Sequence, residues 1–352
     1  ATLDHYFASD PEIFGVTLML VSTKHPCNRM SQQFDSDDLS GPRVSRRTAT
    51  KLFGAAGITG LAGCTSDDGT DDGGDSGSPP SDVDEETLHG GRLTAGWFLG
   101  EVGDLYPAHI SVGQYFQISA NIFNGLVTLN EDVEIVGDLA TDWTVSEDGL
   151  RYEFELRDDV TFHNGEEFTA ADVEYTITHN IETEAPQAPR LADLEPPAEG
   201  GVEVIDDYTV ALNFESPNAA ALAHLTRGPG RVGAIINQTA LEEMGHDQYS
   251  LEPVGTGAFQ VREHDVGSEI ILDAHEEYHE TDADGHSLPY LDGVDIQMIP
   301  EPGTIVNALQ AGDIDFANLV PLENVDEVEG NPDVETSGVV GNGWLGLAMN
   351  QD

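Results

Sequence analysis

Cysteine is almost absent from this sequence of 352 residues, which contains only Cys27 and Cys64. Two cysteines cannot build a disulfide framework or a cysteine-ligated metal cluster, so both classes of site are excluded. An isolated cysteine is usually a small buried hydrophobic residue. Any special role for Cys64 therefore has to come from its neighbours in the chain.

Basic residues are also scarce, with 13 Lys and Arg against 66 Asp and Glu and a net charge of −53. Residues 1–63 hold six of each sign, so the whole excess lies after Cys64, where lysine is absent. A nucleic-acid partner is excluded because it requires a basic surface. An acidic surface of this density repels itself in dilute salt, whereas molar salt screens charges beyond roughly 3 Å. The composition indicates adaptation to molar salt, as in an extreme halophile.

Long hydrophobic runs are missing as well. The uncharged run Leu52 to Gly63 is shorter than the ~20 apolar residues of a transmembrane helix, but it fits the core of a signal peptide. Arg46 and Arg47 precede it as a twin-arginine pair, and "LAGC" ends it at Cys64 in a pattern that resembles the lipobox of secreted lipoproteins. Residues 30–63 are therefore predicted to be a twin-arginine lipoprotein signal peptide, with Arg46 and Arg47 as the export signal and Cys64 as the lipidation site.

The segments on either side of this signal have their own character. A signal peptide should begin close to its arginines, so Met30 is the expected start and residues 1–29 are interpreted as a non-native upstream segment. Residues 64–90 alternate acids with Gly and Ser and include Pro79-Pro80. This composition cannot bury enough apolar surface to offset its conformational entropy, which predicts a disordered acidic linker.

From Gly91 onward the pattern is that of a mixed α/β protein, in a chain that is 39% hydrophobic. Alternation predicts strands in "YEFELR" (152–157), "DDYTVALNF" (206–214), "GAFQVREH" (257–264) and "SEIILDA" (268–274). Thr169, followed three residues later by Asp172, predicts a capped helix in "TAADVEYTITHNI". Gly312 should end a second helix in "GTIVNALQAG".

The order of motifs in this region resembles the family 5 extracellular solute-binding proteins, the peptide, dipeptide and nickel receptors of ABC importers. The stretch from Asp138 to Val173, "DLATDWTVSEDGLRYEFELRDDVTFHNGEEFTAADV", follows the family pattern nearly position by position. "VIDDYTVALNF", "PVGTGAF", "EEYH" and "ALQAGDIDF" follow in the family order.

The resemblance implies an α/β fold of the type II periplasmic-binding-protein kind, with a mixed sheet, flanking helices and a β-rich subdomain. It places the first lobe at 91–316, with an inserted subdomain at about 119–228, and the hinge and start of the second lobe at 317–352. Because family members are roughly twice as long as the folded part here, most of the second lobe is expected to be missing.

The resemblance also implies a function and a site. The expected protein is a lipid-anchored receptor on the extracellular face of the membrane, which captures a peptide or similar small solute and delivers it to an ABC permease, with no catalysis, cofactor or bound metal. The family's cleft loop follows an "LDP" or "LNP" element, and here that element is "LYP", Leu105 to Pro107. The predicted ligand contacts are Ile110, Ser111, Val112, Gly113 and Tyr115, together with Asn318 near the hinge. Which solute is bound, peptide, nickel or oligosaccharide, is left open.

Two other functions are compatible with parts of the sequence. "HEEYH", His275 to His279, matches the zinc-hydrolase pattern H-E-x-x-H. That chemistry requires both histidines on one face of a helix, whereas these residues follow a predicted strand and precede a Gly-containing acidic stretch, so a loop is expected. A purely structural cell-surface lipoprotein would carry the same signal and linker, but the α/β pattern favours a receptor.

Overall fold

The computed structural model describes residues 16–23, 88–130, 133–226, 232–332 and 334–341. Cys64, Arg46 and Arg47 lie outside the described residues, as do the whole predicted signal peptide and all of the predicted linker except residues 88–90. Within the described part, no helix combines the length and the apolar character needed to cross a membrane. The chain divides into two compact units, the first containing residues 93–100 and 296–352 with 1–29, and the second containing residues 30–92 and 101–295.

The first unit is built on a mixed sheet with strand order β13-β1-β12-β2-β11. β2 pairs in parallel with β12, and β1 pairs antiparallel with both β12 and β13. The bounds of its elements are β1 Val16–Thr23, β2 Arg92–Trp97, β11 Gly293–Met298, α8 Pro302–Ala311, β12 Phe316–Ala317, η4 Leu322–Asn324, α9 Val325–Glu329 and β13 Val334–Gly341. β1 was not predicted from the sequence.

The core of the first unit is aliphatic. Ile305 and Leu309 of α8 are fully buried together with Ile314 and Val328. α8 ends where expected, because Gly312 takes the left-handed conformation with φ of 75°, which glycine adopts without steric cost.

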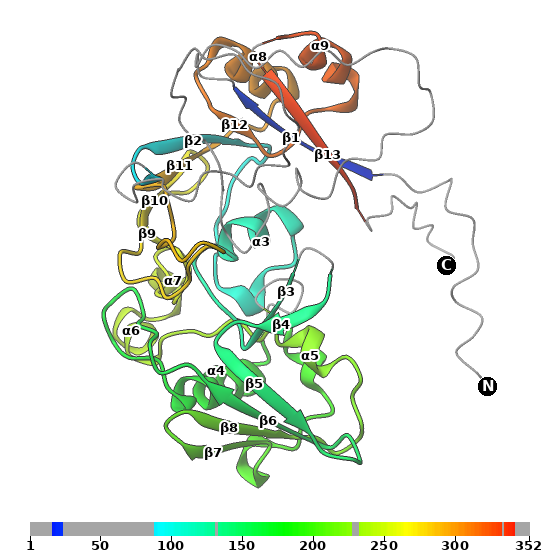
Figure 1. Ribbon diagram of the computed structural model, residues 1–352, viewed down its shortest axis with the longest axis vertical. Helices are drawn as coiled ribbons and strands as arrows, with labels where there is room; N and C mark the ends of the chain where they lie inside the picture. Colours follow the sequence, from blue (N-terminus) through cyan, green and yellow to red (C-terminus); the bar gives the residue numbers. More distant parts are fainter. Residues whose placement is uncertain (1–15, 24–87, 131–132, 227–231, 333, 342–352) are drawn as a thin grey trace, which may run out of the picture. The chain divides into compact units, whose positions relative to one another are not determined.

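The second unit contains a four-stranded antiparallel sheet with order β5-β6-β8-β7, seen at the bottom of Figure 1. Its strands are β5 Ala140–Val145, β6 Arg151–Leu156, β7 Val202–Asp206 and β8 Thr209–Asn213, and α4, Ala170–Glu182, packs against β7 and β8. Tyr152, Phe154 and Leu156 alternate as the buried side of β6, as the sequence pattern predicted. Thr169 is the N-cap of α4, and its backbone N–H donates to Asp172 at 2.8 Å.

The remaining elements of the second unit are short. They are η1 Pro107–His109, α3 Gly113–Ser119, β3 Val127–Leu129, β4 Ile135–Gly137, η2 Ala188–Leu191, η3 Pro197–Glu199, α5 Ala221–His224, α6 Gln238–Met244, α7 His246–Tyr249, β9 Phe259–Asp265 and β10 Glu269–Ala274. β9 and β10 form a hairpin in which Phe259 faces Ala274. The strands predicted at 257–264 and 268–274 are therefore confirmed.

Two family motifs that are distant in the sequence meet at His163. Nε2 of its ring donates to the carbonyl of Gly257 at 3.0 Å, and the N–H of Gly255 donates to Nδ1 at 3.2 Å. The main-chain N–H of His163 also donates to the carbonyl of Gly255 at 2.9 Å. Burial lowers the pKa of His163 to about 3. The "FHNG" and "PVGTG" motifs are thus tied together by a neutral imidazole.

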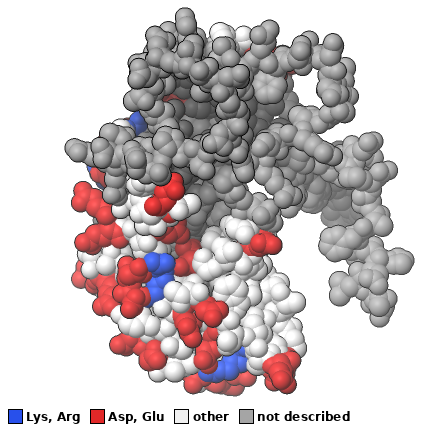
Figure 2. Space-filling model, viewed as in Figure 1, with Lys and Arg blue, Asp and Glu red and all other residues white. Residues whose placement is uncertain are grey.

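Acidic side chains cover the surface of the second unit. Figure 2 shows Asp and Glu spread across its visible face, with Lys or Arg at only a few places. Several of the arginines in the described part are held by carboxylates: Arg92 contacts Asp273 and Asp295 at 2.7 Å each, and Arg151 contacts Glu203 at 2.6 Å.

Candidate functional site

The predicted ligand segment begins with a short, well-fixed turn. Asp104 accepts a hydrogen bond from the backbone N–H of Tyr106 at 2.8 Å, and its second carboxylate oxygen contacts Nδ1 of His109 at 2.9 Å. Pro107 opens the 3-10 helix η1 that follows. Because both carboxylate oxygens of Asp104 are engaged, the direction of the chain entering residue 110 is set locally.

Tyr106 replaces the Asp or Asn of the family element, and the structure shows where the larger side chain goes. Its ring is 1% exposed, and its hydroxyl donates to Oδ1 of Asn180 on α4 at 2.7 Å. The rings of His246 and Tyr249 lie 5.1 and 6.1 Å from it, centre to centre. Burial raises the pKa of this phenol. Tyr106 is therefore a core residue that joins the segment to α4 and α7.

The next residues differ in exposure. Ile110 is 3% exposed, and its carbonyl accepts from Nε2 of Gln187 at 2.9 Å. Ser111, Val112 and Gly113 are exposed, with Val112 at 40%. A Cβ added to Gly113 would meet no atom within 4 Å. Three of the predicted contacts thus form an accessible stretch of surface at the start of α3, while Ile110 anchors it.

Tyr115 and Asn318 already hold main-chain groups. The hydroxyl of Tyr115 donates to the carbonyl of Glu101 at 2.6 Å. Asn318, which belongs to the first unit, is 2% exposed and accepts from the N–H of Phe98 at 2.8 Å. Both side chains form hydrogen bonds with the main chain in this structure. Their roles as ligand contacts stay predictions.

The H-E-x-x-H pentad forms a turn, as expected, because the N–H of Tyr278 donates to the carbonyl of His275 at 3.1 Å. His275 is buried, with Nδ1 3.3 Å from the carbonyl of Gly257, and its ring meets that of His163 at 5.0 Å. Burial lowers the pKa of His275. His279 instead lies beside Asp138 and Glu280. The two histidines do not share a helical face, so the zinc-hydrolase arrangement is absent from these residues.

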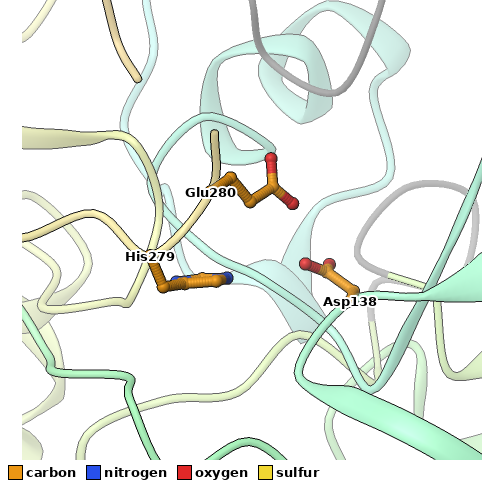
Figure 3. Close-up of side chains that lie close together, drawn as sticks. All are labelled: Asp138, His279 and Glu280. Carbon is orange, nitrogen blue, oxygen red and sulfur yellow. The ribbon is translucent and has the colours of Figure 1, made fainter. Parts of the chain in front are cut away.

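Two groups of side chains in the described residues have metal-ligand character. Asp138, His279 and Glu280 point toward one another in Figure 3. Asp282, Asp284 and His286 form the second group, at the tip of a loop in which Asp282 also accepts from Tyr290. The sequence pattern predicted no metal ligand and did not single out either group. Asp138 carries no local signal, because its partners lie 141 and 142 positions away.

An open cavity of about 840 Å³ lies within the second unit. Its walls include His163, His275, Arg262 and Tyr290, together with Arg92, which shares the carboxylate of Asp273 with Arg262. A smaller one of about 540 Å³ is lined by Leu191, Leu194 and neighbouring prolines. None of the residues predicted to contact ligand lines either cavity.

Comparisons with known proteins identify the family of the chain. The model of the bacterial extracellular solute-binding proteins, family 5 middle region, matches residues 134–352. The chain belongs to this family of receptors, which are binding proteins rather than enzymes.

Particular relatives share the same region. The glutathione-binding protein GsiB of Salmonella paratyphi A is 27% identical over 234 residues, which cover 66% of this chain and 43% of GsiB. The periplasmic binding protein DppA of Helicobacter pylori, solved with the peptide STSA, superposes with a TM-score of 0.60 at 26% identity, covering 70% of this chain and 50% of DppA. AgaA of A. tumefaciens R10, solved with agropinic acid, superposes with a TM-score of 0.61 at 26% identity, covering 69% of this chain and 46% of AgaA. The chain therefore spans about half the length of the proteins it matches, and its fold is of the type II periplasmic-binding-protein kind.

Proposed function

We propose that the chain is part of an extracellular receptor of an ABC importer, which captures a peptide or a similar small solute and passes it to a membrane permease. Membership in the solute-binding family is the observation that carries this proposal. One relative is named for glutathione, and two similar structures were solved with a peptide and with agropinic acid, which supports a peptide or a similar small polar solute. The accessible residues Ser111, Val112 and Gly113 are the proposed contact surface, anchored by Ile110 and flanked by Tyr115.

The attachment to the membrane is part of the same proposal. Arg46 and Arg47 would direct export, and Cys64 would carry the lipid on the extracellular face. A single lipid chain binds a bilayer only marginally, so a second chain or the permease would complete the anchorage. The acidic residues 64–90 would act as the spacer between the lipid and the folded receptor.

The test uses the full chain in molar KCl and follows thermal unfolding with added glutathione and short peptides. A ligand at a hundred times its dissociation constant adds about 2.7 kcal/mol of stability, which raises the melting temperature measurably. The Gly113→Trp variant places a large ring on the contact surface, at a position where an added Cβ meets no atom within 4 Å. It should abolish the ligand-induced shift and leave the melting temperature without ligand unchanged.

Gly303→Trp is the matched control. Gly303 also lies in the first turn of a helix, α8, and also has no atom within 4 Å of an added Cβ. Added ligand should raise the melting temperature of the Gly303→Trp variant by as much as that of the unmodified chain. A receptor role is contradicted if neither glutathione nor any peptide raises the melting temperature of the unmodified chain. That result would favour a structural surface lipoprotein. The contact assignment fails if Gly113→Trp retains the full shift.

A further inference from the structure

The side chains of Asp138, His279 and Glu280 converge from two distant segments of the second unit. Asp138 follows β4, while His279 and Glu280 occupy the turn after β10. One ligand atom from each residue lies within 4.8 Å of the other two, and Figure 3 shows the imidazole ring and the Glu280 carboxylate directed toward Asp138. This arrangement brings one nitrogen donor and two oxygen donors to a single point.

Asp138 is held in a fixed position. The residue is 5% exposed, and one carboxylate oxygen accepts from Nδ2 of Asn124 at 2.7 Å while the other accepts from the N–H of Gly125 at 3.1 Å. Asn124 is itself buried and oriented by the hydroxyl of Thr256 at 3.2 Å. Carboxylates that bind metals are typically oriented by hydrogen bonds of this kind.

The backbone on the other side is equally constrained. The carbonyl of His279 accepts from Nη2 of Arg157 at 3.4 Å, and the carbonyl of Glu280 accepts from the N–H of Leu288 at 3.2 Å. Tyr278, 7% exposed, packs into the interior beside them, and its hydroxyl lies 3.4 Å from Nδ2 of Asn124. Both walls of the cluster are therefore connected through Asn124.

Electrostatics favours a cation at this point. Two carboxylates within 4.8 Å repel each other, and burying one of them in a protein interior is costly unless a positive charge compensates. The net charge of −53 adds to the repulsion. A divalent ion bound between the two oxygens would remove the repulsion and use the imidazole nitrogen as its third ligand.

The donor set indicates which ion. Mg²⁺ and Ca²⁺ prefer six to eight oxygen ligands, whereas one imidazole with two carboxylates suits a first-row transition ion such as Zn²⁺. Ligand atoms at about 2.0–2.2 Å from Zn²⁺ are at most roughly 4.3 Å apart. The three ligand atoms lie within 4.8 Å of one another, and the half-buried side chains of His279 and Glu280 can adjust to reach these metal–ligand distances.

We propose that Asp138, His279 and Glu280 form a binding site for a divalent transition ion of the Zn²⁺ type, with a coordination position left for water. The site lies in the turn that carries "HEEYH", but it uses only the last residue of that pentad. It does not depend on the proposed receptor function.

The test is titration of the full chain with Zn²⁺ in molar KCl, followed by calorimetry, and with Co²⁺, followed by the visible absorption of a low-coordinate cobalt site. The unmodified chain should bind one Zn²⁺ tightly above a weak background from surface acids, and Mg²⁺ should not compete. His279→Gln and Glu280→Gln should each weaken the tight site at least tenfold and abolish the cobalt absorption.

Glu276→Gln is the matched control, because Glu276 is an exposed carboxylate of the same turn and the charge change is identical. Its tight site should be unchanged. The proposal is overturned if the unmodified chain shows no tight site, if His279→Gln binds as tightly as the unmodified chain, or if Glu276→Gln loses as much affinity as Glu280→Gln. Competition by Mg²⁺ at equal concentration would also overturn it.

Discussion

Two histidine environments in the second unit, one at His163 and one at His279, show how differently the fold uses the same side chain. His163 is enclosed by main-chain groups, with a carbonyl on one ring nitrogen and an N–H on the other. His279 lies among carboxylates contributed by Asp138 and Glu280. Burial holds the first ring neutral, whereas the second ring lies beside two carboxylates that could share a cation with it.

The comparison distinguishes a histidine that stabilises the fold, His163, from one that lies among potential metal ligands, His279. His163 belongs to the stretch with the strongest family pattern, yet its contacts are internal and join two backbone segments. The neighbours of His279, by contrast, are the charged side chains of Asp138 and Glu280. His163 therefore stabilises the fold through main-chain contacts, while His279 belongs to a group of potential metal ligands.

The largest loss of stability is expected from Gly257→Ala, which disturbs the backbone that His163 contacts. An added Cβ would lie 2.4 Å from the carbonyl oxygen of Asn121 and 2.5 Å from the carbonyl carbon of Ile122, so the backbone that His163 contacts must shift. We expect a loss of about 3 kcal/mol in the free energy of unfolding, at the upper end for overpacking. Denaturant unfolding in molar KCl measures it.

The control for that substitution is Gly113→Ala, where an added Cβ meets no atom within 4 Å. Gly113 begins α3, and alanine favours a helix over glycine by up to about 1 kcal/mol. The control should be neutral or slightly stabilising. If the two alanine variants unfold at the same denaturant concentration, the close packing of the "PVGTG" motif does not constrain the fold.

A smaller change in the free energy of unfolding is expected when the pH is lowered. The pKa of His163 is lowered to about 3 by burial, against an ordinary value of 6.5. Between these values the unfolded chain binds a proton that the folded chain does not, so stability falls as the pH falls, by about 1.4 kcal/mol per pH unit for one such group. His275, whose pKa is also lowered by burial, acts in the same direction.

His163→Gln isolates that contribution. Glutamine can retain part of the hydrogen bonding but has no group that titrates, so its stability deficit relative to the unmodified chain should shrink between pH 7 and pH 5. Denaturant unfolding at pH 7, 6 and 5 in constant salt gives the difference. A deficit that is constant across this range would show that His163 titrates alike in the folded and unfolded chains.

Local signals in the sequence were sufficient for elements with a clear period or cap. The alternation at Tyr152, Phe154 and Leu156 predicted β6, and Thr169 with Asp172 predicted the start of α4, because these signals operate within a few residues. β1 was missed because residues 1–29 were interpreted as a non-native upstream segment, and its partner β13 lies more than 300 residues later. The convergence of Asp138 with His279 was missed because it arises only from tertiary packing.

The candidate ligand segment, residues 110–115, could be predicted only in part from the sequence. The family resemblance pointed to residues 110–115, and Ser111 to Gly113 are indeed accessible, but the sequence did not indicate that Tyr106 would turn inward. Its burial follows from Asn180 and Tyr249, which offer a hydrogen-bond acceptor and an aromatic wall from two other helices. A side chain's direction at such a point depends on partners that no local pattern reveals.

The smallest expected effect concerns Thr169→Ala. Thr169 lies within the same motif as His163, but its role is local, because its hydroxyl lies 3.1 Å from Asp172 and its position caps α4. Loss of an N-cap residue costs about 1 kcal/mol, and the backbone N–H of residue 169 can still donate to Asp172. Ser111→Ala, an exposed position outside any helix, should change stability by less than about 0.5 kcal/mol. A Thr169→Ala loss as large as that of Gly257→Ala would mean that the motif acts as one cooperative unit, and that the distinction between its long-range contact at His163 and its local cap is wrong.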